Sequence, residues 1–175
     1  MKISKKAFTL LELLISIVIL SIMIVYLYKS YSTLNLSNLN LKKETKAIEN
    51  MEVIKKVLYM DFLNALGNKN SFIKIESRDK DEDFVRLQTN QSLHRRINPY
   101  VTYIVQEKKL YRLESYKPIA NFDMSIDDEF ISDYIGDIEN FNVYKSSEKE
   151  NNLYLIHIKF TSMKEILFMV KALNI

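Results

Sequence analysis

The chain has 175 residues, with 25 Lys and Arg against 22 Asp and Glu, and no cysteine. Without cysteine, disulfides, a thiol nucleophile, an iron–sulfur cluster and a cysteine-ligated zinc site are all excluded. The formal charge of +3 equals the three lysines Lys2, Lys5 and Lys6, so the rest of the chain is neutral and gives no electrostatic motive for binding nucleic acid.

The first predicted element is an apolar helix over residues 8–28. This run contains one charged side chain, Glu12, and at 1.5 Å per residue it is about 31 Å long, enough to span a bilayer once. The lysines before it predict a cytoplasmic N-terminus and a C-terminal part outside, because basic flanks stay in the cytoplasm. A cleavable secretory signal fits less well, since the run is long and no Ala-x-Ala-like site follows it.

Glu12 needs an explanation, because a carboxylate at mid-membrane depth costs on the order of 2.5–3.5 kcal/mol. One interpretation places Glu12 at a shallow depth, where it reaches the headgroups and gains from the positive end of the helix dipole. The other interpretation requires a cationic partner inside the membrane. Both remain open from the residues alone.

The first residues of the run show a family resemblance. Lys5, Lys6, Ala7, Phe8, Thr9, Leu10, Leu11 and Glu12 resemble the prepilin signal of type IV pilins and type II secretion pseudopilins, a basic leader and a small residue followed by Phe-Thr-Leu-x-Glu. The resemblance implies cleavage between Ala7 and Phe8 by the prepilin peptidase and methylation of the new Phe8 amine. Ala7 departs from the glycine that is usual in the family.

Cleavage at this position would give Glu12 a possible partner. The new ammonium at Phe8 lies one helical turn from Glu12 on the same face. In a filament, Glu12 of one subunit would pair with the Phe8 amine of a neighbour, removing two poorly solvated charges at once. We therefore expect Glu12 to set the register of assembly and to have no catalytic role.

The helical pattern continues beyond the apolar run, without glycine or proline, as far as Gly67. The apolar residues recur at three- and four-residue steps, at Ile48, Met51, Ile54, Leu58, Phe62 and Ala65. Gly67 is the expected stop. We divide the chain into a leader (1–7), a transmembrane half of the helix (8–28), an amphipathic outer half (29–66) and a sheet domain (67–175).

After Gly67 the apolar pattern alternates, as it does in strands. Strands are predicted at 73–75, 85–87, 99–106, 110–116, 141–143, 154–160 and 166–170. The clearest hairpin joins 99–106 to 110–116 through the turn 107–109. The expected fold class is α+β, with the outer half of the helix packed on an antiparallel β-sheet, as in pilins.

Residues 121–140 are strongly acidic and contain no Lys or Arg. Their carboxylates are Asp123, Asp127, Asp128, Glu129, Asp133, Asp137 and Glu139. Calcium prefers clustered carboxylates, and the resemblance adds that some pseudopilins bind it, but the spacing fits no EF-hand loop. We expect a solvated acidic loop, or a face that meets a basic neighbour, and we predict no metal and no other cofactor.

The two histidines are far apart in the sequence. His94 precedes Arg95 and Arg96 in a basic cluster, for which we expect solvation rather than contact with an adjacent subunit or lipid. His157 should point away from the face of its apolar neighbours. No serine elbow, glycine-rich loop or HExxH motif is present, so we predict that the chain is not an enzyme.

A fainter resemblance concerns the sheet domain. Residues 100–103, 110–114 and 134–160 are similar to the hairpin and C-terminal strands of J-type minor pseudopilins and W-type minor pilins. This resemblance implies a minor pilin-like subunit of a type II secretion or type IV pilus-like system, placed in the filament tip complex.

The expected partners are the prepilin peptidase/methyltransferase, other minor and major pilin-like subunits, the inner-membrane assembly platform and the lipid bilayer. The expected location is the inner (cytoplasmic) membrane, with the C-terminal domain extracytoplasmic, and then the filament. The alternatives are an uncleaved single-pass membrane protein with an outward-facing binding domain and, less favoured, an anchored enzyme.

Overall fold

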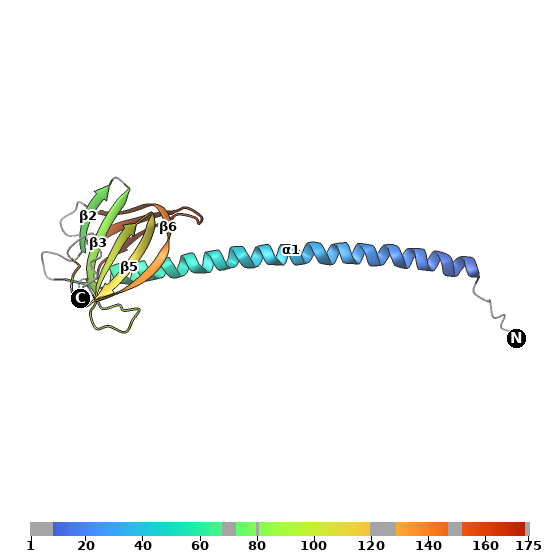
Figure 1. The fold of residues 1–175 in the computed structure, drawn as a ribbon, viewed down its shortest axis with the longest axis horizontal. Helices are drawn as coiled ribbons and strands as arrows, with labels where there is room; N and C mark the ends of the chain where they lie inside the picture. The colour runs from blue at the N-terminus through green and yellow to red at the C-terminus, as the bar shows by residue number, and fades with distance from the viewer. Residues whose placement is uncertain (1–8, 68–72, 80, 120–128, 147–151, 174–175) are drawn as a thin grey trace. The chain divides into compact units, whose positions relative to one another are not determined.

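The computed structural model describes residues 9–67, 73–79, 81–119, 129–146 and 152–173. One helix, α1 (Leu10–Leu63), precedes all the strands (Figure 1). The strands are β1 (Ala65–Leu66), β2 (Ile73–Asp79), β3 (Glu82–Thr89), β4 (Tyr100–Gln106), β5 (Lys109–Ser115), β6 (Phe130–Lys145), β7 (Leu153–Phe160) and β8 (Ile166–Lys171). The predicted fold class is confirmed: a long N-terminal helix is followed by an antiparallel sheet, in a pilin-like α+β fold.

The chain divides into two compact units, residues 1–48 and residues 49–175, and α1 contributes to both. The helix ends at Leu63, before the predicted stop at Gly67. Asn64 makes the last helical bond, from its backbone N–H to the carbonyl of Met60 at 3.1 Å, and its side-chain nitrogen donates to the same carbonyl at 2.9 Å. The next two residues form strand β1, because their backbone groups pair with β3. This pairing overrides their helical propensity.

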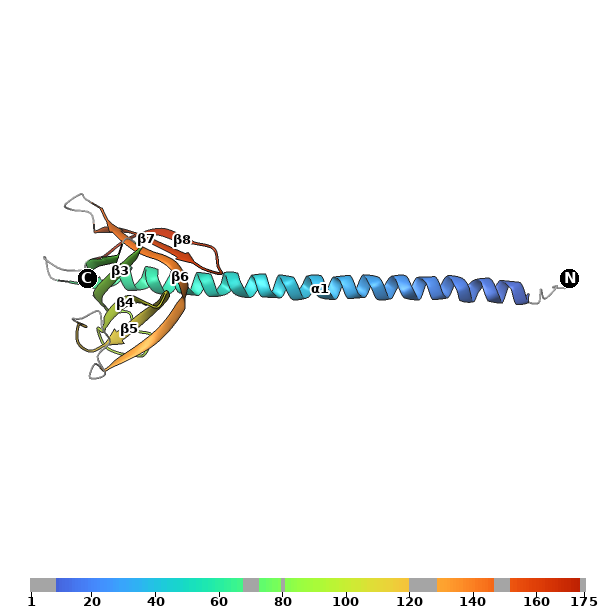
Figure 2. The same cartoon turned by 45° about the horizontal axis from the view of Figure 1, so that its top comes forward.

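The sheet has the strand order β1-β3-β4-β5-β6-β7-β8, and β2 pairs with the same strand as β1, namely β3. The long strand β6 connects the part of the sheet that ends in β5 to the part formed by β7 and β8. Its first half pairs with β5 and its second half with β7, with register shifts near residues 135 and 139 where extra residues bend the strand. The sheet therefore curls around the last turns of α1, with β4 and β5 on one side and β7 and β8 on the other (Figure 2).

Gly136 lies at the bend of β6, against the ring of Phe160. A Cβ atom at this position would lie 2.9 Å from Cε1 of Phe160, closer than side-chain carbons approach one another. The aromatic ring of Phe160 in β7 therefore packs directly on the β6 backbone, and a larger residue at position 136 would require this ring to shift.

The curl is closed by a contact between β6 and the start of β3. Glu82 pairs in parallel with Phe141, whose N–H donates to the carbonyl of Asp81 at 2.9 Å. The buried carboxylate of Asp83 accepts a bond of 2.7 Å from the N–H of Val143. Strands β3 to β6 therefore form a nearly closed ring.

The core lies between the inner face of this sheet and the last turns of α1. Leu58 and Phe62 of the helix are fully buried, and Met51 and Ile54 pack beside them, as the helical pattern predicts. Ile48 of the same predicted stripe is 54% exposed. Alternate residues of the strands, among them Val85, Val101, Ile156 and Ile158, complete the core.

The predicted hairpin is confirmed as β4 and β5. Its turn has positive φ at both Glu107 (50°) and Lys108 (59°), the geometry that suits the twist of a two-residue hairpin. Neither residue is the glycine or asparagine that usually signals such a turn, so the sequence could indicate the hairpin but not the turn type.

A buried ion pair joins α1 to the sheet within this apolar core. Arg112 of β5 donates from Nε to Oδ2 of Asp61 at 2.7 Å and from Nη2 to Oδ1 at 3.2 Å. The hydroxyl of Tyr103 donates to the same Oδ2 at 2.6 Å. All three residues are fully buried, and the pair fixes one rotation and one height of α1 on the sheet.

A second carboxylate, Glu114, lies beside this pair and is also fully buried. It accepts bonds from Nη1 of Arg112 at 2.8 Å, from the hydroxyl of Ser92 at 2.6 Å and from the N–H of Leu93 at 3.1 Å. Burial acts to raise the pKa of Glu114, but these bonds outweigh it and hold the pKa below its usual value. At Asp61 burial dominates, and the pKa is raised.

Arg112 should therefore be much more important for stability than an exposed cation. Arg112→Leu leaves two buried carboxylates without their cation, and we expect the free energy of unfolding to fall by about 3–5 kcal/mol. The control is Lys159→Leu, which breaks an exposed ion pair with Glu139 and should change stability little. Denaturant unfolding of the full chain, followed by tyrosine circular dichroism, measures both. Equal losses in the two variants would contradict the proposed weight of the buried pair.

The lowered pKa of Glu114 predicts how stability depends on pH. A carboxyl with a lower pKa in the folded state stabilises the fold above its unfolded pKa, and this contribution is lost as the pH falls through the folded pKa. Glu114→Gln should therefore be less stable than the native chain at pH 7, and the difference should shrink at pH values below about 4.5. Unfolding measured across the acid range tests this, and a difference that is independent of pH would contradict it.

Candidate assembly segment at the start of the helix

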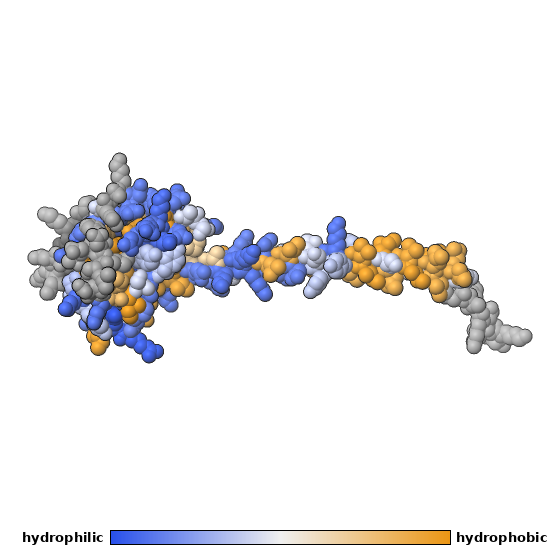
Figure 3. All heavy atoms as spheres, viewed as in Figure 1, coloured by the Kyte–Doolittle hydropathy of each residue, from blue (hydrophilic) through white to orange (hydrophobic). Residues whose placement is uncertain are grey.

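The first part of α1 exposes an uninterrupted apolar surface. The large apolar and aromatic side chains from residue 10 to residue 28 are all between 48 and 85% exposed, and in Figure 3 this segment is mostly orange. Among the described residues, α1 is the one helix that is long and apolar enough to cross a membrane. Burying each such side chain contributes roughly 1.5–3 kcal/mol, so lipid or other helices are the expected surroundings.

The helix begins with a reciprocal cap formed by Thr9 and Glu12. Oε2 of Glu12 accepts bonds from the backbone N–H of Thr9 at 2.9 Å and from its hydroxyl at 3.0 Å. In return, the N–H of Glu12 donates to the hydroxyl oxygen of Thr9 at 3.3 Å. This is the capping-box arrangement, in which a threonine and a glutamate three residues later satisfy the free N–H groups at a helix start.

The other hydroxyls near Glu12 are also satisfied within the helix. Ser16 donates to the carbonyl of Glu12 at 2.7 Å, and Ser21 donates to the carbonyl of Ile17 at 2.8 Å. Such internal bonds let polar side chains enter an apolar medium without an unpaired donor. The segment is therefore suited to lipid although it contains serine and glutamate.

The cap gives Glu12 a local role that neither sequence interpretation included. The signal was present, because Thr9-x-x-Glu12 before an apolar run is the sequence pattern of a capping box. Both bonds from Thr9 reach Oε2, and no other donor among the described residues bonds to the Glu12 carboxylate. Ala7 and Phe8, the predicted cleavage and methylation residues, lie outside the described residues, as do the leader lysines.

For His94 and Arg96 the structure corrects the prediction of a solvated basic cluster before the hairpin, whereas Arg95 between them is exposed, as predicted. Nε2 of His94 lies 2.9 Å from Oδ2 of Asp133. Arg96 donates to the carbonyl of Glu114 at 2.9 Å and stacks over Tyr116, with its guanidinium carbon 4.4 Å from the ring centroid. These residues meet acidic or aromatic groups of their own chain, which sequence spacing could not indicate because the partners lie 18 to 39 positions away.

The predicted acidic loop is in part a strand. Residues 130–140 form the first part of β6, where pairing with β5 overrides the polar composition. Asp133 accepts from Nη1 of Arg112 at 3.4 Å, and Glu139 pairs with Lys159 at 2.5 Å. Asp123, Asp127 and Asp128 lie outside the described residues. Within the described part of the chain, no group of three His, Cys, Asp or Glu side chains is placed to hold a metal.

His157 lies where the alternation predicts. Its strand neighbours Ile156 and Ile158 are fully buried on the core face. His157 is on the opposite face, with Nε2 3.4 Å from Oε2 of Glu165. This partly exposed pair is part of the outer surface of β7 and β8.

Comparison with known proteins gives one match. Residues 3–28 match the family model of the prokaryotic N-terminal methylation motif, and no curated protein and no solved structure matches the chain. This motif is the N-terminal signature of the type IV pilin and pseudopilin superfamily and implies processing by the prepilin peptidase. Together with the apolar helix it implies association with a membrane or a filament. The chain thus combines the methylation motif of that superfamily with a pilin-like α+β fold.

Proposed function

We propose that the chain is a minor pilin-like subunit that is cleaved after Ala7, methylated at Phe8 and assembled through its apolar helix into a filament. The observation that carries this proposal is that the methylation motif, residues 3–28, overlaps an apolar helix that begins at Leu10. Cleavage before Phe8 would remove the basic leader and leave α1 complete. The product would be an apolar helix with a new ammonium at Phe8, shortly before Glu12 in the sequence.

The capping geometry supports a role for Glu12 in assembly. In the free subunit, Thr9 donates two hydrogen bonds to Oε2 of Glu12. These bonds lower the cost of placing the carboxylate near the membrane surface. On assembly, Oε1 would accept from the Phe8 ammonium of a neighbouring subunit without breaking the cap. A single charge in an apolar filament core is costly unless an opposite charge lies beside it. The contact would therefore select the one axial register that brings the two charges together.

The remaining features of the proposal concern placement. The leader lysines would hold the N-terminus in the cytoplasm, with residues 67–175 extracytoplasmic. We propose that residues 1–7 act as the leader and 8–28 as the transmembrane half of the helix, that the predicted outer half, 29–66, is helical as far as Leu63, and that the residues after it belong to the globular domain. The resemblance of 100–103 and 110–114 to J-type and W-type subunits supports a place in the tip complex of a type II secretion or type IV pilus-like system.

The first test is the mass of the N-terminal peptide from the membrane fraction, with and without the prepilin peptidase. We expect a peptide that begins at methylated Phe8 only when the peptidase is present. A peptide that begins at Met1 in both cases would identify the alternative, an uncleaved single-pass membrane protein with an outward-facing binding domain.

The second test separates assembly from capping at Glu12. Glu12→Gln keeps an oxygen that accepts from Thr9 but removes the charge, whereas Glu12→Leu removes both. If the charge pairs with a neighbour, both variants should be cleaved normally and enter sheared filaments at least about tenfold less than the native chain, equivalent to about 1.4 kcal/mol. Quantitative immunoblotting of cleaved and filament-borne subunit measures this.

Ser21→Leu is the matched control, because it removes a polar side chain from the same segment without touching a charge. It should assemble like the native chain. Normal assembly of Glu12→Gln alongside poor assembly of Glu12→Leu would show that Glu12 acts only as a cap, and the intersubunit pair would be rejected.

A further inference from the structure

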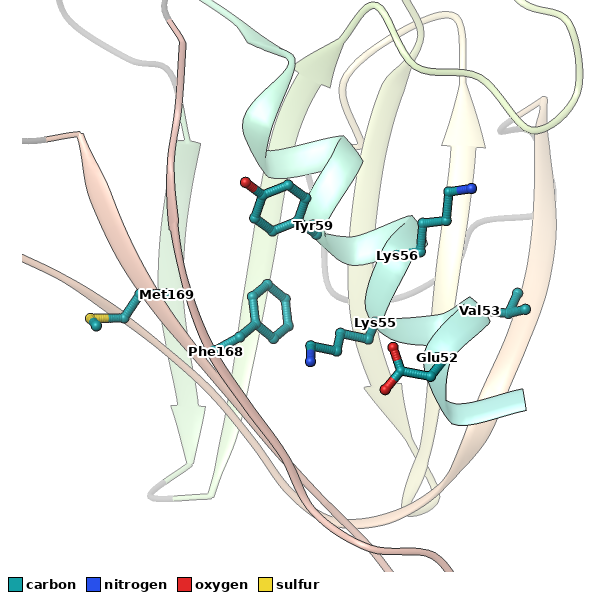
Figure 4. Close-up of a pocket in the computed structure, with 7 residues that line it drawn as sticks. All are labelled: Glu52, Val53, Lys55, Lys56, Tyr59, Phe168 and Met169. Atoms are coloured by element: carbon teal, nitrogen blue, oxygen red, sulfur yellow. The ribbon is translucent and has the colours of Figure 1, made fainter. Parts of the chain in front are cut away.

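An apolar groove of about 510 Å³ lies between α1 and β8. Val53 and Tyr59 of the helix and Phe168 of β8 are among the residues that line it (Figure 4). The charged residues of its lining have both signs, so the groove does not indicate the chemistry of a partner. An earlier part of α1, residues 29–48, does indicate it, because its charges are segregated.

Three lysines of this segment lie together on one side of the helix. Lys42, Lys43 and Lys46 follow Leu39 at steps of three, four and seven residues, the spacing that places side chains on one face. We define these four residues as the basic face. Glu44, the acidic residue of segment 29–48, lies roughly 150° around the helix axis from the centre of the three lysines. It is therefore on the opposite side.

The basic face has no partner within the described part of the chain. Its four side chains are exposed. The ion pairs among the described residues include neither the three lysines nor Glu49, which follows at the end of the face. Lys42 and Lys46 are four residues apart, and like charges at that spacing destabilise a helix. The clustering is unfavourable unless an anionic group lies against it, which is typical of a functional surface.

The position of the basic face argues against lipid headgroups as this anionic group. Lys42 is 14 residues beyond Tyr28, where the apolar segment ends, and this interval is about 21 Å of helix. The headgroup layer on each side of a bilayer is only about 5–8 Å thick. Residues 29–48 are exposed on every side of the helix, so another helix can lie along them.

We propose that the basic face binds a helix of another membrane-spanning protein that carries Asp or Glu at the same three- and four-residue spacing. Each lysine pairs with a carboxylate, and Leu39 packs against an apolar side chain of the partner. Single exposed ion pairs are weak, but two helices anchored in one bilayer have a high effective concentration. The inference rests on the membrane-spanning helix of the proposed function and not on cleavage before Phe8.

Energy transfer in vesicles of neutral lipid tests this on the full chain. Because the chain has no cysteine, Ser37→Cys supplies a single labelling site, on the side of the helix away from the basic face. The probe is a synthetic helix that spans the bilayer and continues with glutamates level with Lys42, Lys43 and Lys46. Its matched control carries lysines there. We expect the acidic probe to associate at least about tenfold more strongly, and this preference to shrink at high salt.

Two variants assign the preference to the basic face. A chain with Lys42→Glu, Lys43→Glu and Lys46→Glu should reverse it, because the acidic probe is then repelled. A chain with Lys42→Gln, Lys43→Gln and Lys46→Gln should abolish it. The matched control is Glu44→Gln, which removes a charge from the opposite side and should keep the preference within about twofold. Glutamate and glutamine are good helix formers, and circular dichroism checks that the helix persists.

Three outcomes would overturn the proposal. The first is equal association of the two probes at low salt. The second is a preference for the acidic probe that survives the triple glutamate substitution. The third is quenching of the label at position 37 by quenchers on phosphatidylglycerol headgroups, lost in the triple glutamine chain, because lipid would then cover the basic face. All three readouts use the uncleaved chain, so they can fail while the N-terminal peptide mass still supports the proposed function.

Discussion

The buried pair between Asp61 and Arg112 is the interaction on which the sheet unit depends. Its atoms lie between the last turns of α1 and β5, in a core that is otherwise apolar. Hydrophobic contacts alone tolerate small rotations of a helix on a sheet, because they have no preferred direction. A two-point bond between a guanidinium and a carboxylate does have one. The pair therefore contributes specificity of packing, at a desolvation cost that Tyr103 and Glu114 help to offset.

The same physical rule applies at the other end of α1. Glu12, like Asp61, is a carboxylate in surroundings that disfavour charge, and its position is explained by the donors around it. Asp61 has all its partners within the folded chain. The Glu12 carboxylate has one partner among the described residues, Thr9, and both of its bonds reach the same oxygen, Oε2. This difference separates a residue that completes a domain from one that is suited to joining subunits.

The secondary structure was largely predictable, because each element depends on local periodicity. The hairpin of β4 and β5 and the alternation along β7 appear where the sequence pattern indicates them. The errors occur where distant partners decide the backbone. Leu66 leaves the helix to pair with Gln88. The acidic stretch 130–140 becomes strand because its first part pairs with β5 and its end pairs with β7. A basic residue such as His94 was expected in solvent, and its partner Asp133 lies 39 positions away.

The sequence by itself determined the apolar segment, its methylation motif and the α+β class, since length, charge and periodicity are properties of neighbouring residues. Only the tertiary structure decided which charges are buried together and where β6 bends. Asp61 and Arg112 are 51 positions apart, and the Phe160 ring packs on the backbone at Gly136. Such contacts depend on how the curled sheet encloses the helix, and no local pattern in the chain encodes that geometry.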